Sequence, residues 1–203
     1  MKTYLIYILF FIFYFFVTNY LISASNKPDV LTSIVLYWMI FCVLIGVLEV
    51  VLFFTSKYIS QLPKYTKTNY WLRDITTSEI FHSNFWSHAW KEYGDFCDAR
   101  YIKPQNIVHW IEINHAVTSF IYIFIIYKLL TGKNMNKQPL IGILMIAISS
   151  VHLIGTIIYL LTFDKYLKKN PLKKTTKFWS YLSLNFLWFI MPVFVFVKGC
   201  KII

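Results

Sequence analysis

Glutamate and histidine residues inside apolar segments are the residues of this sequence best suited to chemistry. Glu49 is the one charged residue of residues 31–55, and Glu112 and His115 lie three positions apart in a later apolar segment. An ionisable side chain at membrane depth is costly, so each is by default a functional candidate. Two carboxyl groups close together cannot easily both ionise, so one can remain a proton donor while the other accepts a proton. For each residue alone, the alternative is a neutral side chain that bonds to a neighbouring helix.

The segment that carries Glu112 gathers its polar residues on one side. At about 3.6 residues per turn, His109, Glu112, His115 and Ser119 fall within about one third of the circumference of a helix. A lone histidine there would most often be structural. Several ionisable residues on one stripe favour a functional role.

The elements that hold these side chains are predicted to be membrane helices. The chain has 203 residues, of which 58% are hydrophobic and 14% are charged, whereas soluble domains carry about 25% charged residues. Apolar runs of about 18 residues or more can cross the hydrocarbon core of a bilayer. The sequence therefore predicts an all-α, polytopic membrane protein with five transmembrane helices, at about residues 4–23, 31–55, 105–130, 139–163 and 178–198.

The last two predicted helices also carry polar stripes. Their members are His152, Thr156 and Tyr159 in the fourth helix and Asn185, Trp188 and Pro192 in the fifth. Residues at these spacings share one helix face. We therefore expect the helices to form a bundle around a polar spot within an apolar, lipid-accessible cavity. Simple packing of Trp188 between helices is the alternative for that residue.

Such a cavity suits one class of reaction. Glu49 and Glu112 would supply an acid and a base, and His115 and His152 can shuttle a proton. Trp188 offers a π face to a cation, an attraction of about 2 kcal/mol or more when desolvated. Together these groups could protonate an alkene, shield the carbocation and remove a different proton, and the apolar surroundings imply a lipidic substrate.

Charge and motifs argue against several other functions. The net charge of +11 comes from lysines in loops and flanks, where they face lipid headgroups, so nucleic acid is not an expected partner. The three cysteines form no CxxC pair and no disulfide framework. His82 and His88 match no usual metal motif and are expected at the surface, so no metal or cofactor is predicted. A proton-coupled transporter would usually show paired halves, and this chain has no internal repeat.

Residues 56–104 form the longest stretch outside the predicted helices. They mix charged residues with many aromatic ones, a composition that indicates short helices lying on the membrane surface. Thr76-Thr77-Ser78-Glu79 predicts a helix start before residues 79–93.

Four blocks in order resemble the emopamil-binding protein family, which includes sterol 8-to-7 isomerases and the emopamil-binding-like proteins. The most specific block runs from Trp90-Lys-Glu-Tyr to Asp98-Ala-Arg100, with one residue more before Asp98 than the family pattern has. The other three blocks are the helix with Glu112, Gly155-Thr-Ile-Ile-Tyr159-Leu-Leu-Thr162, and Asn185-Phe-Leu-Trp188-Phe-Ile-Met-Pro192. Glu49 matches the glutamate of the family's second helix. The resemblance covers roughly residues 31–198.

This resemblance implies a multi-pass protein of the endoplasmic reticulum, often a homodimer, whose cavity binds a sterol or an amine drug. Residues 31–198 would form an EXPERA-type sterol-binding domain, preceded by a first helix and turn in residues 1–30. The resemblance implies Glu49 and Glu112 as catalytic residues, and His115 is the third catalytic candidate; no cofactor is required. The expected substrate-binding residues are Trp188, Asn185, Tyr159, His152 and Tyr101.

Two departures from the family pattern fall in the active centre. Ile45 stands at the position of the family histidine, and His115 stands where the family has a threonine. In one hypothesis, His115 takes over the lost imidazole from the facing helix, and the protein is a sterol isomerase. In the other, proton transfer is lost and a non-catalytic lipid-binding pocket remains. Membrane orientation also stays open, because the lysines of residues 164–177 and the family arrangement place opposite faces in the cytoplasm.

Overall fold

The computed structural model describes residues 1–25, 28–62, 70–102, 107–132, 138–168 and 174–203. These residues form an all-α membrane protein in which five helices are long and apolar enough to span a bilayer. The five are α1 (Thr3–Ala24), α2 (Val30–Ile59), α5 (Ile107–Thr131), α6 (Pro139–Lys168) and α7 (Lys174–Ile202). The predicted fold class is thus confirmed, with α2 and α7 extending several residues beyond the predicted ends.

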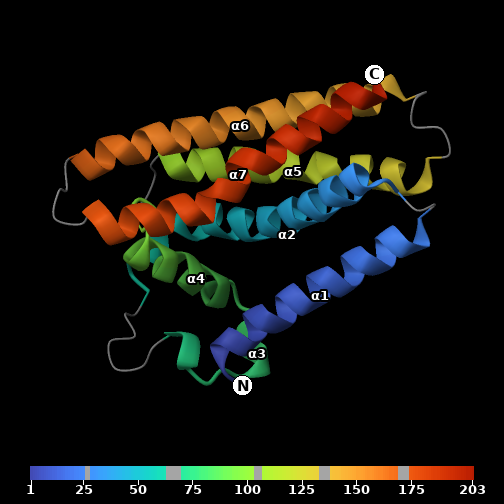
Figure 1. The fold of residues 1–203 in the computed structure, drawn as a ribbon. Helices are drawn as coiled ribbons and strands as arrows, with labels where there is room; N and C mark the ends of the chain where they lie inside the picture. Colours follow the sequence, from blue (N-terminus) through green and yellow to red (C-terminus); the bar gives the residue numbers. More distant parts are fainter. Residues whose placement is uncertain (26–27, 63–69, 103–106, 133–137, 169–173) are drawn as a thin grey trace.

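The bundle consists of two closely packed helix pairs. α2 packs mainly against α5, and α6 packs mainly against α7, which approaches it most closely toward the C-terminus (Figure 1). In the α6–α7 pair, a Cβ atom added at Gly142 would lie 2.7 Å from the carbonyl oxygen of Gly199. Small residues of this kind let membrane helices approach closely.

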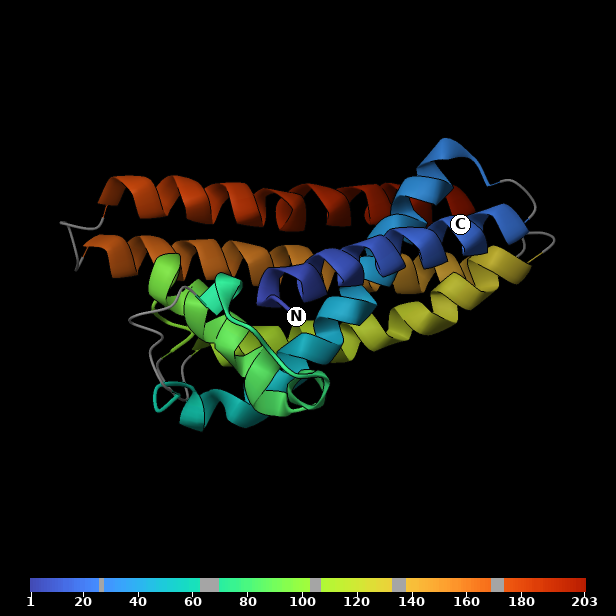
Figure 2. The same cartoon turned by 90° about the horizontal axis from the view of Figure 1, so that it is seen from below.

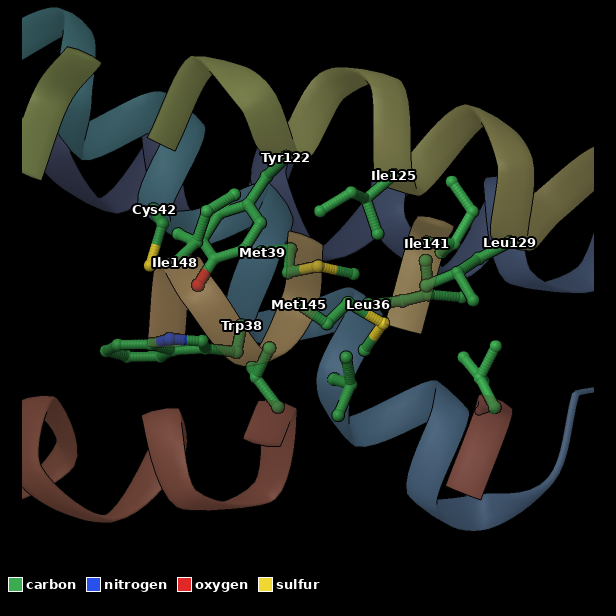
Figure 3. Close-up of a cluster of buried hydrophobic side chains, with 13 residues drawn as sticks. Leu36, Trp38, Met39, Cys42, Tyr122, Ile125, Leu129, Ile141, Met145 and Ile148 are labelled. Carbon is green, nitrogen blue, oxygen red and sulfur yellow. The ribbon is translucent and has the colours of Figure 1, made fainter. Parts of the chain in front are cut away.

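A hydrophobic cluster joins the two pairs. Figure 3 shows side chains from α2, α5, α6 and α7 in contact, with Trp38 of α2 lying above α7 and Tyr122 of α5 pointing toward Cys42. Cys42, Met39 and Leu36 are fully buried on successive turns of α2. This cluster fixes the four helices on one side of the cavity.

Helix α1 crosses over α2 when seen from below (Figure 2), and in its middle the Tyr14 hydroxyl donates to the carbonyl of Tyr37 of α2 at 2.8 Å. Its start is tied to the segment before α4: Thr3 donates to the carbonyl of Arg73 at 2.9 Å, and Lys2 pairs with Asp74 at 2.6 Å. Ile6 packs against Ile75 and Phe85. The start of the first helix is therefore anchored through residues 73–85.

The segment between α2 and α5 contains the 3-10 helix η1 (Tyr70–Leu72), α3 (Thr77–Ile80) and α4 (Ser83–Phe96). The predicted helix start is present, since the Glu79 carboxylate accepts from the backbone N–H of Thr76 at 2.8 Å. However, the helix that begins there ends after one turn. The expected continuous helix over residues 79–93 is wrong, because His82 adopts an extended conformation and caps α4.

The expected surface position of His88 is also wrong. His88 is buried on the inner side of α4, where its ring stacks on Tyr70 and its Nδ1 lies 2.8 Å from the Asn84 carbonyl. His82 is exposed, as expected. The sequence alone did not show that α4 buries one face against α2 and η1.

Candidate active site

A cavity of about 620 Å³ opens among α1, α2, α4, α5, α6 and α7. This volume lies within the range of about 300–1,000 Å³ that is typical of small-molecule sites. Its wall is predominantly apolar and aromatic. All eight residues that the sequence singled out line it: Glu49, Tyr101, Glu112, His115, His152, Tyr159, Asn185 and Trp188. The structure thus brings together residues from four helices and one loop, while their roles stay predictions.

Glu49 and His115 form a close polar pair in the cavity wall. The Glu49 Oε2 lies 2.6 Å from the His115 Nδ1, and both side chains are buried. The two residues meet because α2 and α5 pack closely one turn away, where a Cβ atom at Gly46 would lie 3.4 Å from the backbone of Ala116. A carboxyl group and an imidazole at this distance can share or exchange a proton.

Glu112 lies beside this pair. Its carboxylate accepts a hydrogen bond from the Tyr101 hydroxyl, and its oxygens lie within 4.8 Å of ligand atoms of Glu49 and His115. Burial, together with the adjacent carboxylate of Glu112, raises the pKa of the Tyr101 hydroxyl well above its usual value. Tyr101 therefore remains a hydrogen-bond donor to Glu112 at any physiological pH.

Three aromatic side chains, Trp90, Tyr93 and Tyr101, cover the carboxyl groups from the α4 side. Trp90 and Tyr101 stack in parallel with ring centroids 5.3 Å apart, and Tyr93 meets Tyr101 edge-on at 4.8 Å. The Trp90 indole N–H donates to the carbonyl of Leu48 at 3.1 Å, which fixes α4 next to Glu49. The block that carries the family resemblance thus forms a wall of the cavity.

His152 and Trp188 complete the polar end of the cavity around His115. The rings of His115 and His152 have centroids 4.2 Å apart, and Trp188 meets the His115 ring edge-on at 4.5 Å. His152 Nε2 lies 2.8 Å from the Thr118 hydroxyl. A cation that forms near the carboxyl groups would therefore lie close to an indole ring.

Tyr159 connects the cavity to a buried ion pair. Its hydroxyl donates to Asp98 Oδ2 at 2.8 Å, and Asp98 accepts two further bonds from Arg100, from Nε at 3.0 Å and from Nη2 at 2.7 Å. Arg100 also donates to the Thr162 hydroxyl at 2.5 Å. Asp98 and Arg100 therefore fasten the loop before α5 to α6 and hold Tyr101 in the cavity.

Sequence reasoning missed the part of the wall that α1 contributes. Phe11, Tyr14 and Phe15 line the cavity, but the first apolar run has no polar stripe that distinguishes one face. Ile45, at the family histidine position, also lines the cavity one turn before Glu49. The position of Tyr93 in the cavity wall could have been predicted, because Tyr93 belongs to the same sequence block as Trp90.

Comparison with known families agrees with this geometry. A family model described as EXPERA (EXPanded EBP superfamily) matches residues 85–199, more than half of the chain. The protein belongs to the EXPERA family. This match confirms the resemblance inferred from the four blocks. It includes Glu112, His115, His152 and Trp188 but not α2, so Glu49 and Ile45 lie outside the matched EXPERA region. Comparisons with curated proteins and with solved structures found no match.

Proposed function

We propose that this protein is a sterol isomerase of the endoplasmic reticulum membrane that moves a ring double bond from the 8 to the 7 position. The observation that carries the proposal is the cluster of Glu49, Glu112 and His115 in the wall of a largely apolar cavity that Trp188 also lines. Residues 31–198 would then act as the sterol-binding domain, with α1 closing one side of the cavity.

The proposed reaction adds one proton to the ring double bond and removes another from the neighbouring ring carbon. The Glu49–His115 pair, joined at 2.6 Å, would deliver the first proton to the alkene. This leaves a carbocation, which Trp188 would stabilise through its π face. Glu112, held by Tyr101, would accept the proton that leaves. A proton passed back within the cluster, from Glu112 to the Glu49–His115 pair, would then restore the starting protonation states. The reaction therefore needs no redox cofactor.

The 2.6 Å contact supports the hypothesis that His115 takes over the lost imidazole. Ile45, on α2 at the family position, cannot move a proton, whereas His115 reaches Glu49 from the facing helix. If His115 is a proton donor, His115→Ala should lower turnover by about a hundredfold or more, since positioned acid–base groups contribute about 10²–10⁴-fold. His82→Ala, which changes an exposed histidine outside the cavity lining, is the control. Turnover that survives His115→Ala would contradict this role.

The alternative is a non-catalytic binder of sterols, lipids or amine drugs. The observation in its favour is the apolar Ile45 where the family pattern has its histidine. A binder would show ligand-dependent thermal stabilisation without product. Ligand binding by such a protein would also be insensitive to conservative changes in the proton-transfer groups, provided that the shape of the cavity is kept.

The decisive experiment incubates the purified protein with an 8-unsaturated sterol in D₂O and analyses the sterols by mass spectrometry. An isomerase would yield the 7-unsaturated product with one deuterium from solvent, and Glu112→Gln would abolish it. Glu79→Gln, the same change at a glutamate of α3 outside the cavity, should leave turnover intact. Binding of the sterol without any conversion would refute the isomerase and favour the binder.

A further inference from the structure

A second set of side chains meets beside the carboxyl cluster. Cys42 of α2, His115 of α5 and His152 of α6 each offer one ligand atom, and these atoms lie within 4.8 Å of one another. All three side chains are buried, and Cys42 is fully so. We propose that Cys42, His115 and His152 form a binding site for a zinc ion at the inner end of the cavity.

The hydrogen bonds of the two imidazoles suit metal binding. One nitrogen of each ring has a short contact: His115 Nδ1 with Glu49 at 2.6 Å and His152 Nε2 with Thr118 at 2.8 Å. The other nitrogens have only long contacts, His115 Nε2 to Ser119 at 3.5 Å and His152 Nδ1 to Tyr122 at 3.4 Å. Metal-bound histidines usually donate their second N–H to a carboxylate or another oxygen, which fixes the orientation of the ring.

The donor set favours zinc among the common metal ions. One thiolate and two imidazoles are ligands that zinc accepts readily, with Zn–S near 2.3 Å and Zn–N near 2.0–2.1 Å. Tetrahedral coordination at those lengths places ligand atoms about 3.3–3.6 Å apart. Because the three ligand atoms lie within 4.8 Å of one another, side-chain rotations that close their separations by at most about 1.5 Å would be sufficient.

The fourth coordination position faces the cavity. His115 and His152 line the cavity, whereas Cys42 lies behind them in the hydrophobic cluster next to Tyr122 (Figure 3). A site with three protein ligands and one open position would accept water or a donor atom of a ligand in the cavity. Bound zinc would also occupy Nε2 of His115, but the site itself does not depend on the proposed isomerase reaction.

No sequence motif indicates this site, because its ligands come from three different helices. Sequence motifs for zinc detect ligands a few residues apart on one segment. Here 73 positions separate Cys42 from His115, and 37 more separate His115 from His152. Only the packing of α2, α5 and α6 brings them together.

The test titrates the purified, chelator-treated full-length protein with Co²⁺ in a Cys200→Ser background, because Cys200 is an exposed thiol. Ligation by a thiolate gives a sulfur-to-cobalt charge-transfer band in the near ultraviolet. We expect equimolar Co²⁺ binding with this band, and displacement by Zn²⁺, which binds such sites more tightly. Cys42→Ala should abolish the band, and Cys97→Ala, at a thiol that is also buried but lies outside the cluster, should keep it.

Two further variants identify the site and guard against misfolding. Glu49→Gln should weaken Co²⁺ binding by about 10–100-fold as the hydrogen-bond partner of a ligand, and Glu112→Gln should leave it unchanged. His152→Gln, if Cys42→Ala does not fold, should lower the affinity at least tenfold. Binding without a thiolate band, a band that survives Cys42→Ala, or the absence of binding would overturn the proposal. Binding that is lost in Glu112→Gln would instead indicate a site at Glu49, Glu112 and His115.

Discussion

Asp98→Asn should destabilise the protein strongly, although Asp98 lies outside the membrane-spanning helices. Asp98 has no exposed surface, and Arg100 is 7% exposed. The carboxylate accepts from both Nε and Nη2 of Arg100 and from the Tyr159 hydroxyl. An amide in its place keeps the shape but removes the charge, so the buried guanidinium loses its ion pair with Asp98.

The size of the effect follows from the burial of the pair. Removing one partner of a buried ion pair costs about 3–5 kcal/mol, because the remaining charge is uncompensated. The amide oxygen of asparagine can still accept one hydrogen bond, so we expect a loss near the lower end, about 3 kcal/mol. For a chain of this length, that corresponds to a melting temperature lower by about 6–12 °C.

The assay is thermal unfolding of the purified protein in one detergent, followed by tryptophan fluorescence. Asp74→Asn is the matched control, because Asp74 is 74% exposed and its partner Lys2, at 2.6 Å, is 43% exposed. An exposed ion pair contributes little to stability, so this variant should melt within a few degrees of the wild type.

The two changes to this ion pair should also be non-additive. In the Asp98→Asn background, Arg100→Met should cost less than it does in the wild type, because the ion pair that it would break is already lost. If Asp98→Asn melts like Asp74→Asn, or if the two changes add fully, the loop before α5 is not held by this ion pair. The position of Tyr101 in the cavity would then need another explanation.

Three further predictions test other parts of the structure. Trp188→Leu should weaken the binding of a lipophilic amine about 30-fold, the equivalent of about 2 kcal/mol of cation–π attraction. Phe189→Leu, on the exposed side of α7, should change the Kd little. Equal effects of the two variants on the Kd would exclude a specific role for the indole. Gly142→Ala should lower the melting temperature, since its Cβ would lie 2.7 Å from a backbone oxygen of α7 and overpacking costs about 1–3 kcal/mol. Gly155→Ala should be tolerated, because its Cβ would lie 3.7 Å from the nearest atom. A larger loss of melting temperature in Gly155→Ala than in Gly142→Ala would show that α6 and α7 are not in close contact at Gly142. The backbone N–H of Thr32 at the start of α2 lowers the pKa of Asp29 to about 2. The wild type should therefore be more stable than Asp29→Ala by its full margin above about pH 4, and this margin should decline as the pH falls toward 2. A difference in melting temperature between the two proteins that does not change with pH would contradict the capping role.

The long helices were predictable because each apolar run is long enough to cross a bilayer by itself. The polar stripe with Glu112 and His115 was also predictable, because helical periodicity alone places its members on one face. The ends of α2 and α7 were less predictable, since a helix can continue past its apolar run into the membrane interface at little cost. The break between α3 and α4 depends on the backbone of His82, which no local pattern indicated.

The contacts between helices could not be predicted from any single segment. Glu49 meets His115 because Gly46 and Ala116 let α2 and α5 approach closely. Both small residues are visible in the sequence, but small residues occur on many faces, and nothing local says which two will meet. The same holds for α1, whose uniformly apolar run conceals which residues line the cavity.

The departures at Ile45 and His115 become physically connected once these contacts are known. An imidazole at position 45 would lie one helical turn from Glu49 on the same helix, and the imidazole at position 115 reaches Glu49 from the facing helix at 2.6 Å. The exchange therefore keeps a carboxyl–imidazole pair in the cavity wall while moving its histidine next to His152 and Cys42. A pocket that had merely lost its proton chemistry would have no need to retain such a costly pair at membrane depth. The geometry thus favours a histidine that was relocated over one that was lost, and it makes the same histidine the meeting point of the proposed proton path and the proposed metal site.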